Sequence, residues 1–568
     1  MSDNHNHGND FISRAIDGAE YYGNSVHSGS FEEILDQRST IESKTRDQID
    51  ETDKTDSLEY ENDLDTNPEK LPEILIQAGE LDRICDEAEH ALSMQPNVYQ
   101  RGNLICFCQK IPETNDLAIK PLSKPALLRR LSLSAVWLRF NEKDGEEKVC
   151  DPPDRINSSV FDAQQYPHLK PLAGIARQPY LRPDDSLVTK AGYDEQTKLL
   201  ATFEPERFSI PVNVTREDAI CSLDKLKTLI AEFSFLSECD RAAALCAILT
   251  AAIRPSLPVA PMFHVKAPQV SSGKSYLCSV IAAFTGDATP PATAFPTTEE
   301  EAQKLLLATF LESPACMIFD NMTTDIYPYR ALCSALTEPY LSGRILGVSK
   351  TATVTTATLV LSSGNNVSPI KDMTRRCVPI HLDPKMEIPA QKQYVKEPLK
   401  LVRARRGEFV AATLIIILGW IQAGRPVTEV KSLASYDRWS HLTRQPLLWL
   451  GMEDPATRLF SQLEHDPDRE YLGQLLNTWY ANFGSAPKMV RDVVHHANGY
   501  IFGSQDSARG DLKEALLEQF DEKGDINRKR LGWWLSRKEG QVVAGLRFER
   551  TSGSFSSEKW AVRKATEG

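Results

Sequence analysis

The stretch Ala267-Pro-Gln-Val-Ser-Ser-Gly-Lys-Ser275 decides the fold class that the sequence predicts. An apolar run at Met262–Val265, which favours a strand, comes before it, and a stretch that favours a helix begins within it and extends over Lys274–Ala283. A loop in this position turns backbone N–H groups and the positive end of the helix toward a phosphate. The sequence therefore predicts a phosphate-binding loop in an α/β fold.

The residue types in this loop indicate a nucleotide site. We expect Lys274 to reach the β- and γ-phosphates of ATP and the Ser275 hydroxyl to hold Mg²⁺. The loop departs from the usual phosphate-binding pattern, because Pro268 replaces its first glycine and Ser271 replaces a later one. A chance Gly-Lys-Ser triplet in an ordinary loop is the alternative interpretation. The residues that we expect to bind ATP are Pro268, Ser271, Ser272, Gly273, Lys274 and Ser275.

A second pattern places an acidic residue at the end of a buried strand. The apolar run Ala315-Cys-Met-Ile-Phe-Asp320 predicts a strand that delivers Asp320 as a second contact to Mg²⁺. The amide of Asn321, which follows, cannot act as a general base. Glu300 or Glu301 is therefore the candidate base that activates water. The alternative is that these two acids only stabilise the start of their helix through its macrodipole.

Two further segments complete the predicted catalytic set. The run Thr358–Asn366 predicts a strand, and we expect the amide of Asn365 at its end to orient the attacking water and sense the γ-phosphate. Before the predicted strand Cys377–Leu382 stand Arg375 and Arg376, which we expect to act as arginine fingers on the γ-phosphate of a neighbouring subunit. Taken alone, each of these segments would be a turn or a solvated pair of charges.

Charge is distributed unevenly along the chain. Residues 1–70 contain 18 acidic and 6 basic residues, a net charge of −12, whereas the whole chain has a net charge of −13. Residues 526–568 contain ten Lys or Arg and four Glu, a net charge of +6. A nucleic-acid contact is therefore expected at the C-terminal end.

A basic helix is predicted at Arg528–Lys538, with Asn527 as its N-cap. Leu531, Trp534 and Leu535 should face inward. Two alternating strands follow this helix, a pattern that resembles a winged helix, in which the helix would lie in a DNA groove and the wing against phosphates. A solvated basic face, or a winged helix that docks a protein, is the alternative. The residues that we expect to contact DNA are Arg528, Lys529, Arg530, Arg537 and Lys538.

The length of 568 residues leaves room for several domains, and 41% hydrophobic residues are enough for true cores. In the N-terminal part, Ser123–Phe140 predicts a helix.

The apolar run Phe409–Ile421 is too short to span a membrane, and no secretory signal is visible, so we expect a cytoplasmic protein that makes no membrane contact. The predicted divisions are a disordered acidic tail at 1–70, an α+β accessory domain at 71–205, an ATPase core at 206–390, a helical region at 391–484 and a winged-helix-like domain at 485–568.

The order of these motifs resembles that of the AAA+ ATPases, particularly the superfamily 3-like helicases and primase–helicase-type ATPases of prophages and plasmids. This resemblance covers roughly residues 170–460. It implies a P-loop NTPase core, ATP and Mg²⁺ as cofactors, DNA as a partner, a homo-oligomeric ring, and a separate primase or polymerase as a further partner. The residues that carry it are Ala267–Ser275, Phe319–Asn321, Arg344–Gly347, Ser363–Asn366, Asp372–Arg376 and Trp449–Pro455.

Three functions follow from these observations. The first is an ATP-hydrolysing, helicase-like DNA motor in the replication of a prophage or other mobile element. The second is a helicase loader or origin-binding initiator, which hydrolyses ATP without unwinding DNA. The third is a DNA-binding scaffold that does not hydrolyse ATP. No cluster of carboxylates for primase chemistry is visible in the sequence, so priming activity is not implied.

Overall fold

The computed structural model describes residues 71–112, 114, 116–345, 350–386, 394–464, 467–499, 507–551 and 558–565. The predicted acidic tail at 1–70 lies outside these residues. The chain from Leu71 to Gly568 forms one unit by its internal contacts. The boundaries predicted at 205, 390 and 484 therefore stay predictions.

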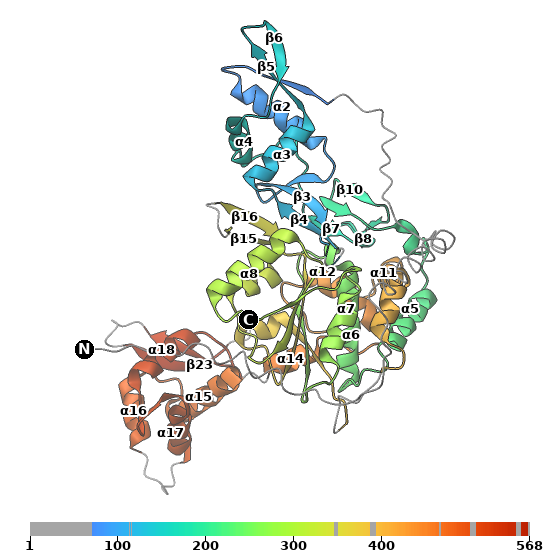
Figure 1. Ribbon diagram of the computed structural model, residues 1–568. Coiled ribbons are helices and arrows are strands. Elements are labelled where there is room, and N and C mark those ends of the chain that lie inside the picture. Colours follow the sequence, from blue (N-terminus) through green and yellow to red (C-terminus); the bar gives the residue numbers. More distant parts are fainter. Residues whose placement is uncertain are drawn as a thin grey trace, which may run out of the picture. The chain divides into compact units, whose positions relative to one another are not determined.

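The largest sheet of the described chain has five strands and lies among helices (Figure 1). Its order is β13-β14-β17-β12-β18, and every neighbouring pair in it is parallel. The four longer strands are almost continuously buried, as expected when helices cover both faces of a parallel sheet. The predicted α/β class is thus confirmed. The strands are β12 (Met262–Ala267), β13 (Ala292–Thr293), β14 (Cys316–Met322), β17 (Leu359–Asn365) and β18 (Cys377–His381).

Helices and a hairpin connect these strands. The largest apolar cluster joins α6, α7 and α11 to the sheet, and α7 packs on β12, β14 and β17. The N-terminus of α5 is fixed by a capping box between Thr215 and Asp218. The elements are α5 (Arg216–Leu229), α6 (Glu238–Ile253), α7 (Lys274–Ala282), α8 (Glu299–Glu312), α9 (Arg330–Thr337), the hairpin β15 (Tyr340–Arg344) and β16 (Thr351–Thr355), and the 3₁₀ turns η1 (Pro205–Arg207), η2 (Arg254–Ser256) and η3 (Lys371–Arg376).

The apolar run at Phe409–Ile421 lies within α11, where its side chains are buried against α5 and α6. None of the described helices is both long and apolar enough to cross a membrane. The helices of this region are α10 (Pro398–Ala404), α11 (Arg406–Gln422), α12 (Asp437–Trp439), the π-helical turn η5 (Ser440–Arg444), α13 (Gln445–Trp449) and α14 (Thr457–Glu464).

The N-terminal part has an apolar cluster of its own, centred on Leu127 and Trp137. The predicted helix Ser123–Phe140 is wrong after Ser134, where the helix ends and the chain continues as β5, which pairs in parallel with β1. Pairing with a distant strand thus overrides the local helical pattern. The elements are β1 (Glu73–Ile76), α2 (Leu81–Ser93), β2 (Val98–Arg101), β3 (Leu104–Lys110), β4 (Leu117–Pro121), α3 (Lys124–Ser134), β5 (Val136–Asn141), β6 (Glu146–Val149) and α4 (Asp154–Phe161).

Five short strands lie between this part and the central sheet in the sequence. Their buried residues, among them Tyr180, Leu199 and Leu200, belong to the two apolar clusters that also contain residues of the central sheet. They therefore pack with the sheet although they precede it in the chain. These strands are β7 (Gly174–Ala176), β8 (Tyr180–Leu181), β9 (Leu187–Val188), β10 (Gly192–Asp194) and β11 (Leu199–Ala201).

The C-terminal part has a separate apolar cluster under a three-stranded sheet of order β19-β23-β22. The predicted helix Arg528–Lys538 is confirmed as α18, and the Asn527 side chain accepts a hydrogen bond from the Arg530 backbone N–H at 3.0 Å. The elements are α15 (Pro467–Phe483), β19 (Lys488–Met489), α16 (Val490–Asn498), α17 (Ser507–Phe520), β20 (Asp521–Glu522), β21 (Asp525–Ile526), α18 (Arg528–Lys538), β22 (Leu546–Thr551) and β23 (Lys559–Lys564).

Candidate nucleotide-binding site

The glycine-containing loop connects β12 to α7, as the sequence predicts. Gly273 is the N-cap residue of α7 and has a φ of +83°, a left-handed conformation that suits glycine. Ser271 also has a positive φ, of +57°. The Ser272 hydroxyl donates to the Gln269 carbonyl at 2.6 Å and closes the loop on itself. The loop is therefore a tight turn that ends at the positive end of a helix.

Lys274 begins α7 and lies inside this turn. Its side chain is buried, and its Nζ donates to the Gln269 carbonyl at 2.9 Å. Burial lowers the pKa of Lys274, and the charge of Asp320 offsets that effect only in part. The ammonium group is therefore short of negative charge, which a bound phosphate would supply.

The hydroxyl of Ser275 and the carboxylate of Asp320 are in direct contact. Ser275 Oγ donates to Asp320 Oδ1 at 2.7 Å, although the two residues lie on α7 and on β14. A third residue, Ser363 on β17, donates to the same Asp320 oxygen. The sequence motifs that were expected to share Mg²⁺ are thus brought together at the carboxyl edge of the sheet.

Ser363 takes part in this contact, and no role for it was predicted from the sequence. Between the pairs Phe319–Ser362 and Met322–Gly364, two residues of β14 face one residue of β17, which is a β-bulge. The bulge allows the Ser363 hydroxyl to donate to Asp320 and to accept from the Asn321 backbone N–H at 3.2 Å. The strand register that creates this contact is not visible in the sequence.

The polar residues at the strand ends differ in exposure. Asn365 is exposed at the end of β17, directly opposite Ala267, the last residue of β12 before the loop. It therefore lies next to the phosphate loop, as a water-orienting amide requires. The Asn321 side chain donates to Asp320 Oδ2 at 3.4 Å.

Glu300 and Glu301 have other partners in the described chain. Glu300 forms an exposed ion pair with Lys304 at 2.6 Å. Glu301 accepts from the backbone N–H and the hydroxyl of Thr297, which lowers its pKa. Both residues stabilise the start of α8, as in the alternative interpretation given above. The role of either as general base stays a prediction.

The two predicted arginine fingers have different environments. Arg376 is buried and donates from Nη1 to the backbone carbonyl of Asp372 at 2.8 Å and to its carboxylate at 2.6 Å. The Arg375 side chain is 37% exposed and forms an ion pair with the same carboxylate at 2.7 Å. Arg375 is thus the more accessible of the two to a neighbouring subunit.

An aromatic cluster borders the phosphate loop. The rings of Phe233, Tyr276 and Tyr394 lie within 4.8–5.9 Å of one another between centroids. The hydroxyl of Tyr394 lies so close to the backbone of Gly273 that a Cβ atom added there would be 2.1 Å from it. The cluster therefore fixes one side of the loop.

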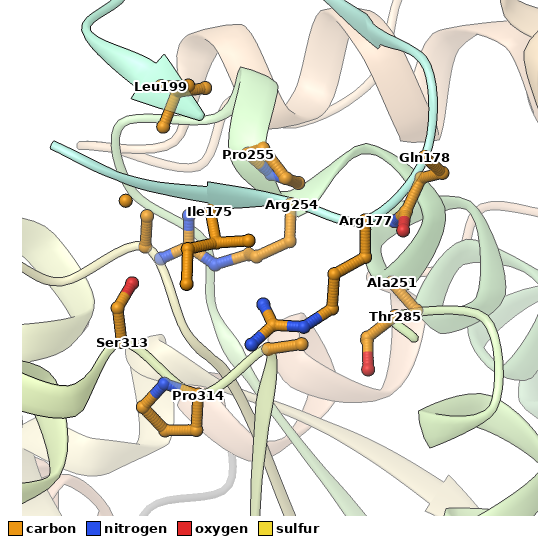
Figure 2. Close-up of a pocket in the computed structure, with 13 residues that line it drawn as sticks. Ile175, Arg177, Gln178, Leu199, Ala251, Arg254, Pro255, Thr285, Ser313 and Pro314 are labelled. Carbon is orange, nitrogen blue, oxygen red and sulfur yellow. The ribbon is translucent and has the colours of Figure 1, made fainter. Parts of the chain in front are cut away.

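A pocket lies at the edge of the sheet opposite the phosphate loop, and its residues support the fold (Figure 2). Its wall includes Pro314, just before β14, and Ala357, just before β17, so it lies at the amino ends of these strands. Arg254 in this wall is buried and donates to the carbonyls of Leu257, Thr356 and Thr358 at 2.6–3.2 Å. Two of these bonds hold the backbone just before β17.

The basic helix has the exposure that its sequence predicts. Leu531 and Leu535 are buried, and Trp534 packs on the C-terminal apolar cluster. The first turn exposes three cations, and Arg530 also donates to the Gln519 carbonyl at 2.7 Å. The residues predicted to bind DNA are exposed, apart from the half-buried Lys538; they are Arg528, Lys529, Arg530, Arg537 and Lys538.

The residues at the phosphate loop fit ATP and Mg²⁺. Mg²⁺ prefers oxygen ligands, and the Ser275 hydroxyl and Asp320 carboxylate offer them from neighbouring elements. Lys274 and the N-terminus of α7 supply positive charge for the phosphates. When bound, Mg²⁺ would neutralise charge on the β- and γ-phosphate oxygens.

No known family model matches the chain, and no curated protein matches it in sequence. Among solved structures, it is similar to the apo A form of the NrS-1 C-terminal region, with 11% identity and a TM-score of 0.37, over 80% of this chain and 96% of that one.

The chain is also similar to SCCmec type IV Cch, described as an active helicase, with 11% identity and a TM-score of 0.28, over 83% of this chain and 98% of that one. For JCV helicase bound to a small molecule, the identity is 13% and the TM-score 0.19, over 46% of this chain and 72% of that one. Likenesses at these TM-scores carry no argument about activity, so the functional proposal rests on the site itself.

Proposed function

We propose that this chain is an ATP-hydrolysing, helicase-like DNA motor with a P-loop NTPase core of the AAA+ type, acting in the replication of a prophage or other mobile element. The observation that carries the proposal is the contact between Ser275 Oγ and Asp320 Oδ1 at 2.7 Å. A hydroxyl and a carboxylate from two motifs meet there, next to a lysine that lacks full charge compensation.

The residues of the site divide the work of phosphoryl transfer. The phosphate loop and Lys274 bind and orient the β- and γ-phosphates, and Ser275 and Asp320 hold Mg²⁺. Ser363 fixes the Asp320 carboxylate in the direction of Ser275. Asn365, opposite the loop, orients the attacking water. Because this chemistry consists largely of positioning and charge stabilisation, small displacements of these groups reduce turnover strongly.

The proposal includes a homo-oligomeric ring in the cytoplasm, with Arg375 of one subunit completing the site of the next. Its support is the exposure of Arg375, which contrasts with the burial of Arg376. Mixing an Arg375→Ala protein with a Lys274→Ala protein should then restore part of the turnover, since mixed rings contain intact interfaces. No recovery in confirmed mixed assemblies would place Arg375 in its own subunit's site or in a structural role.

Two assays test the proposal as a whole. ATP turnover measured with and without single-stranded DNA separates a motor from a scaffold, because only a hydrolysing enzyme releases phosphate. Unwinding of a forked duplex then separates a helicase from a loader or initiator. We expect turnover and unwinding, both lost in the Lys274→Ala protein. Turnover without unwinding would favour the loader or initiator.

A second candidate is a nucleotide-binding scaffold without hydrolysis. Asn321 follows Asp320 directly, and Glu300 and Glu301 have their partners at the start of α8. Among the described residues, no hydrogen bond joins a glutamate to Asp320. ATP binding without phosphate release, in the presence and absence of DNA, is the result that would favour this candidate.

A further inference from the structure

The two neighbouring tryptophans of α18 have opposite environments. Trp534 packs in the C-terminal core, with ring centroids 5.5 Å from Tyr471 and 5.8 Å from Phe520. Trp533 points away from that core and is 73% exposed, which is unusual for so large an apolar ring. The core therefore accounts for Trp534 and leaves the exposure of Trp533 without a structural reason.

Positive charge surrounds Trp533 on the helix surface. Lys529, Arg530 and Arg537 are four residues before it, three before it and four after it, so helical spacing places them on its side of the helix. All three are exposed. Within the described part of the chain, Lys529 and Arg537 form no ion pair with an acidic residue. The indole thus lies in a patch of uncompensated cations.

The neighbouring strand β22 lacks this excess of charge. Arg550 forms ion pairs with Glu539 and Glu558 at 2.8 and 2.9 Å, and Arg547 pairs with Glu549 at 2.6 Å. The cations of β22 are therefore compensated within the protein. The unpaired cations Lys529 and Arg537 thus distinguish α18 from β22, the strand that follows it.

We propose that Trp533 stacks on an unpaired base of single-stranded DNA while Lys529 and Arg537 contact the flanking phosphates. The inference rests on the proposed DNA motor and names the form of DNA that this helix binds. Single-strand sites combine an aromatic platform with cations that follow the backbone. A regular duplex presents base edges to a helix, whereas an indole face needs an unstacked base.

The test uses the full chain and a labelled single-stranded oligonucleotide, with affinity followed by fluorescence anisotropy. Trp533→Ala should weaken binding by about 5- to 100-fold, the range expected for loss of one stacked base. Trp533→Phe should keep most of the affinity, because it retains a ring face. Trp533→Leu should behave as the alanine variant does, because it keeps apolar area without that face.

Salt dependence separates stacking from phosphate contact. Trp533→Ala should leave the slope of log K against log salt unchanged, whereas Lys529→Ala should flatten it by about 0.7 for one single-strand phosphate. The matched control is Val542→Ala, which removes another exposed apolar side chain, 44% exposed, in the same part of the protein. That control should bind as the parent does.

Three results would overturn the inference. Unchanged single-strand affinity in Trp533→Ala would remove the stacking contact. Full affinity in Trp533→Leu with loss in Trp533→Ala would indicate an apolar docking surface, such as one for a protein. A parent protein that binds no single-stranded DNA would also exclude it. ATP turnover without DNA, which Trp533 should not affect, shows independently whether the proposed motor stands.

Discussion

The contact between Ser363 and Asp320 gives the sharpest structural prediction. Ser363 is fully buried, donates to the Asp320 carboxylate and accepts from the Asn321 backbone N–H. A hydrogen bond to a charged group contributes about 1.5–3 kcal/mol. We therefore expect a coupling energy of about that size between Ser363→Ala and Asp320→Ala in a double-mutant cycle.

Hydrogen–deuterium exchange of the full chain provides the assay, because protection of β14 and β17 reports their local opening free energy. Ser363→Ala should raise the amide exchange rates of residues 316–322 and 359–365 by about 10- to 150-fold. This ratio corresponds to the loss of about 1.5–3 kcal/mol of hydrogen-bond energy. Ser275→Ala serves as the comparison and should have a smaller effect, since Ser275 is only half-buried. A coupling energy below about 0.5 kcal/mol would refute the argument, since independent sites add to within that margin.

Two further predictions concern groups that lie beneath and beside the loop. His264 is buried, with its ring nitrogens 2.8 Å from the Ser362 hydroxyl and 3.2 Å from the Val367 carbonyl, and burial lowers its pKa to about 3. An unfolded histidine takes up a proton near pH 6.5, so the contribution of His264 to stability should fall as the pH decreases from 6.5 toward 3. In urea unfolding, the parent should therefore lose about 2 kcal/mol more than His264→Asn between pH 7 and pH 5. Gly273→Ala should abolish ATP binding, because its Cβ would clash with the Tyr394 hydroxyl and its backbone would be strained in the left-handed conformation. Adding Tyr394→Phe removes the clash but not the strain. Calorimetric titration of the double variant with ATP should therefore show only partial recovery of binding.

Local signals predicted the parts of the fold that local interactions determine. The helix α18 has the predicted bounds because Asn527 caps it and an apolar stripe places it on the core. The strand β5 was mistaken for a helix because its conformation depends on pairing with β1, far away in the sequence. The α/β class followed from the alternation of apolar runs and helical patterns.

The sequence predicted the residue types of the candidate site but not all of their contacts. Residue type and order identified Lys274, Ser275 and Asp320, and the structure brings the last two into contact. The role of Ser363 could not be predicted, because it depends on a β-bulge between two strands. The exposure of Trp533 was not predicted, although it lies outside the inward stripe of Leu531, Trp534 and Leu535. Strand register and the partners of each side chain are set by tertiary structure.

The most direct test of the central claim is Mg²⁺-dependent phosphate release from ATP by the full chain and by its Lys274→Ala variant. Removing one cation beside the phosphates leaves the buried strands intact, so circular dichroism should show both proteins folded. We predict turnover in the parent and its loss in the variant, because positive charge at the β- and γ-phosphates is removed. Equal phosphate release by the two proteins would contradict the assignment of this loop as the ATP site.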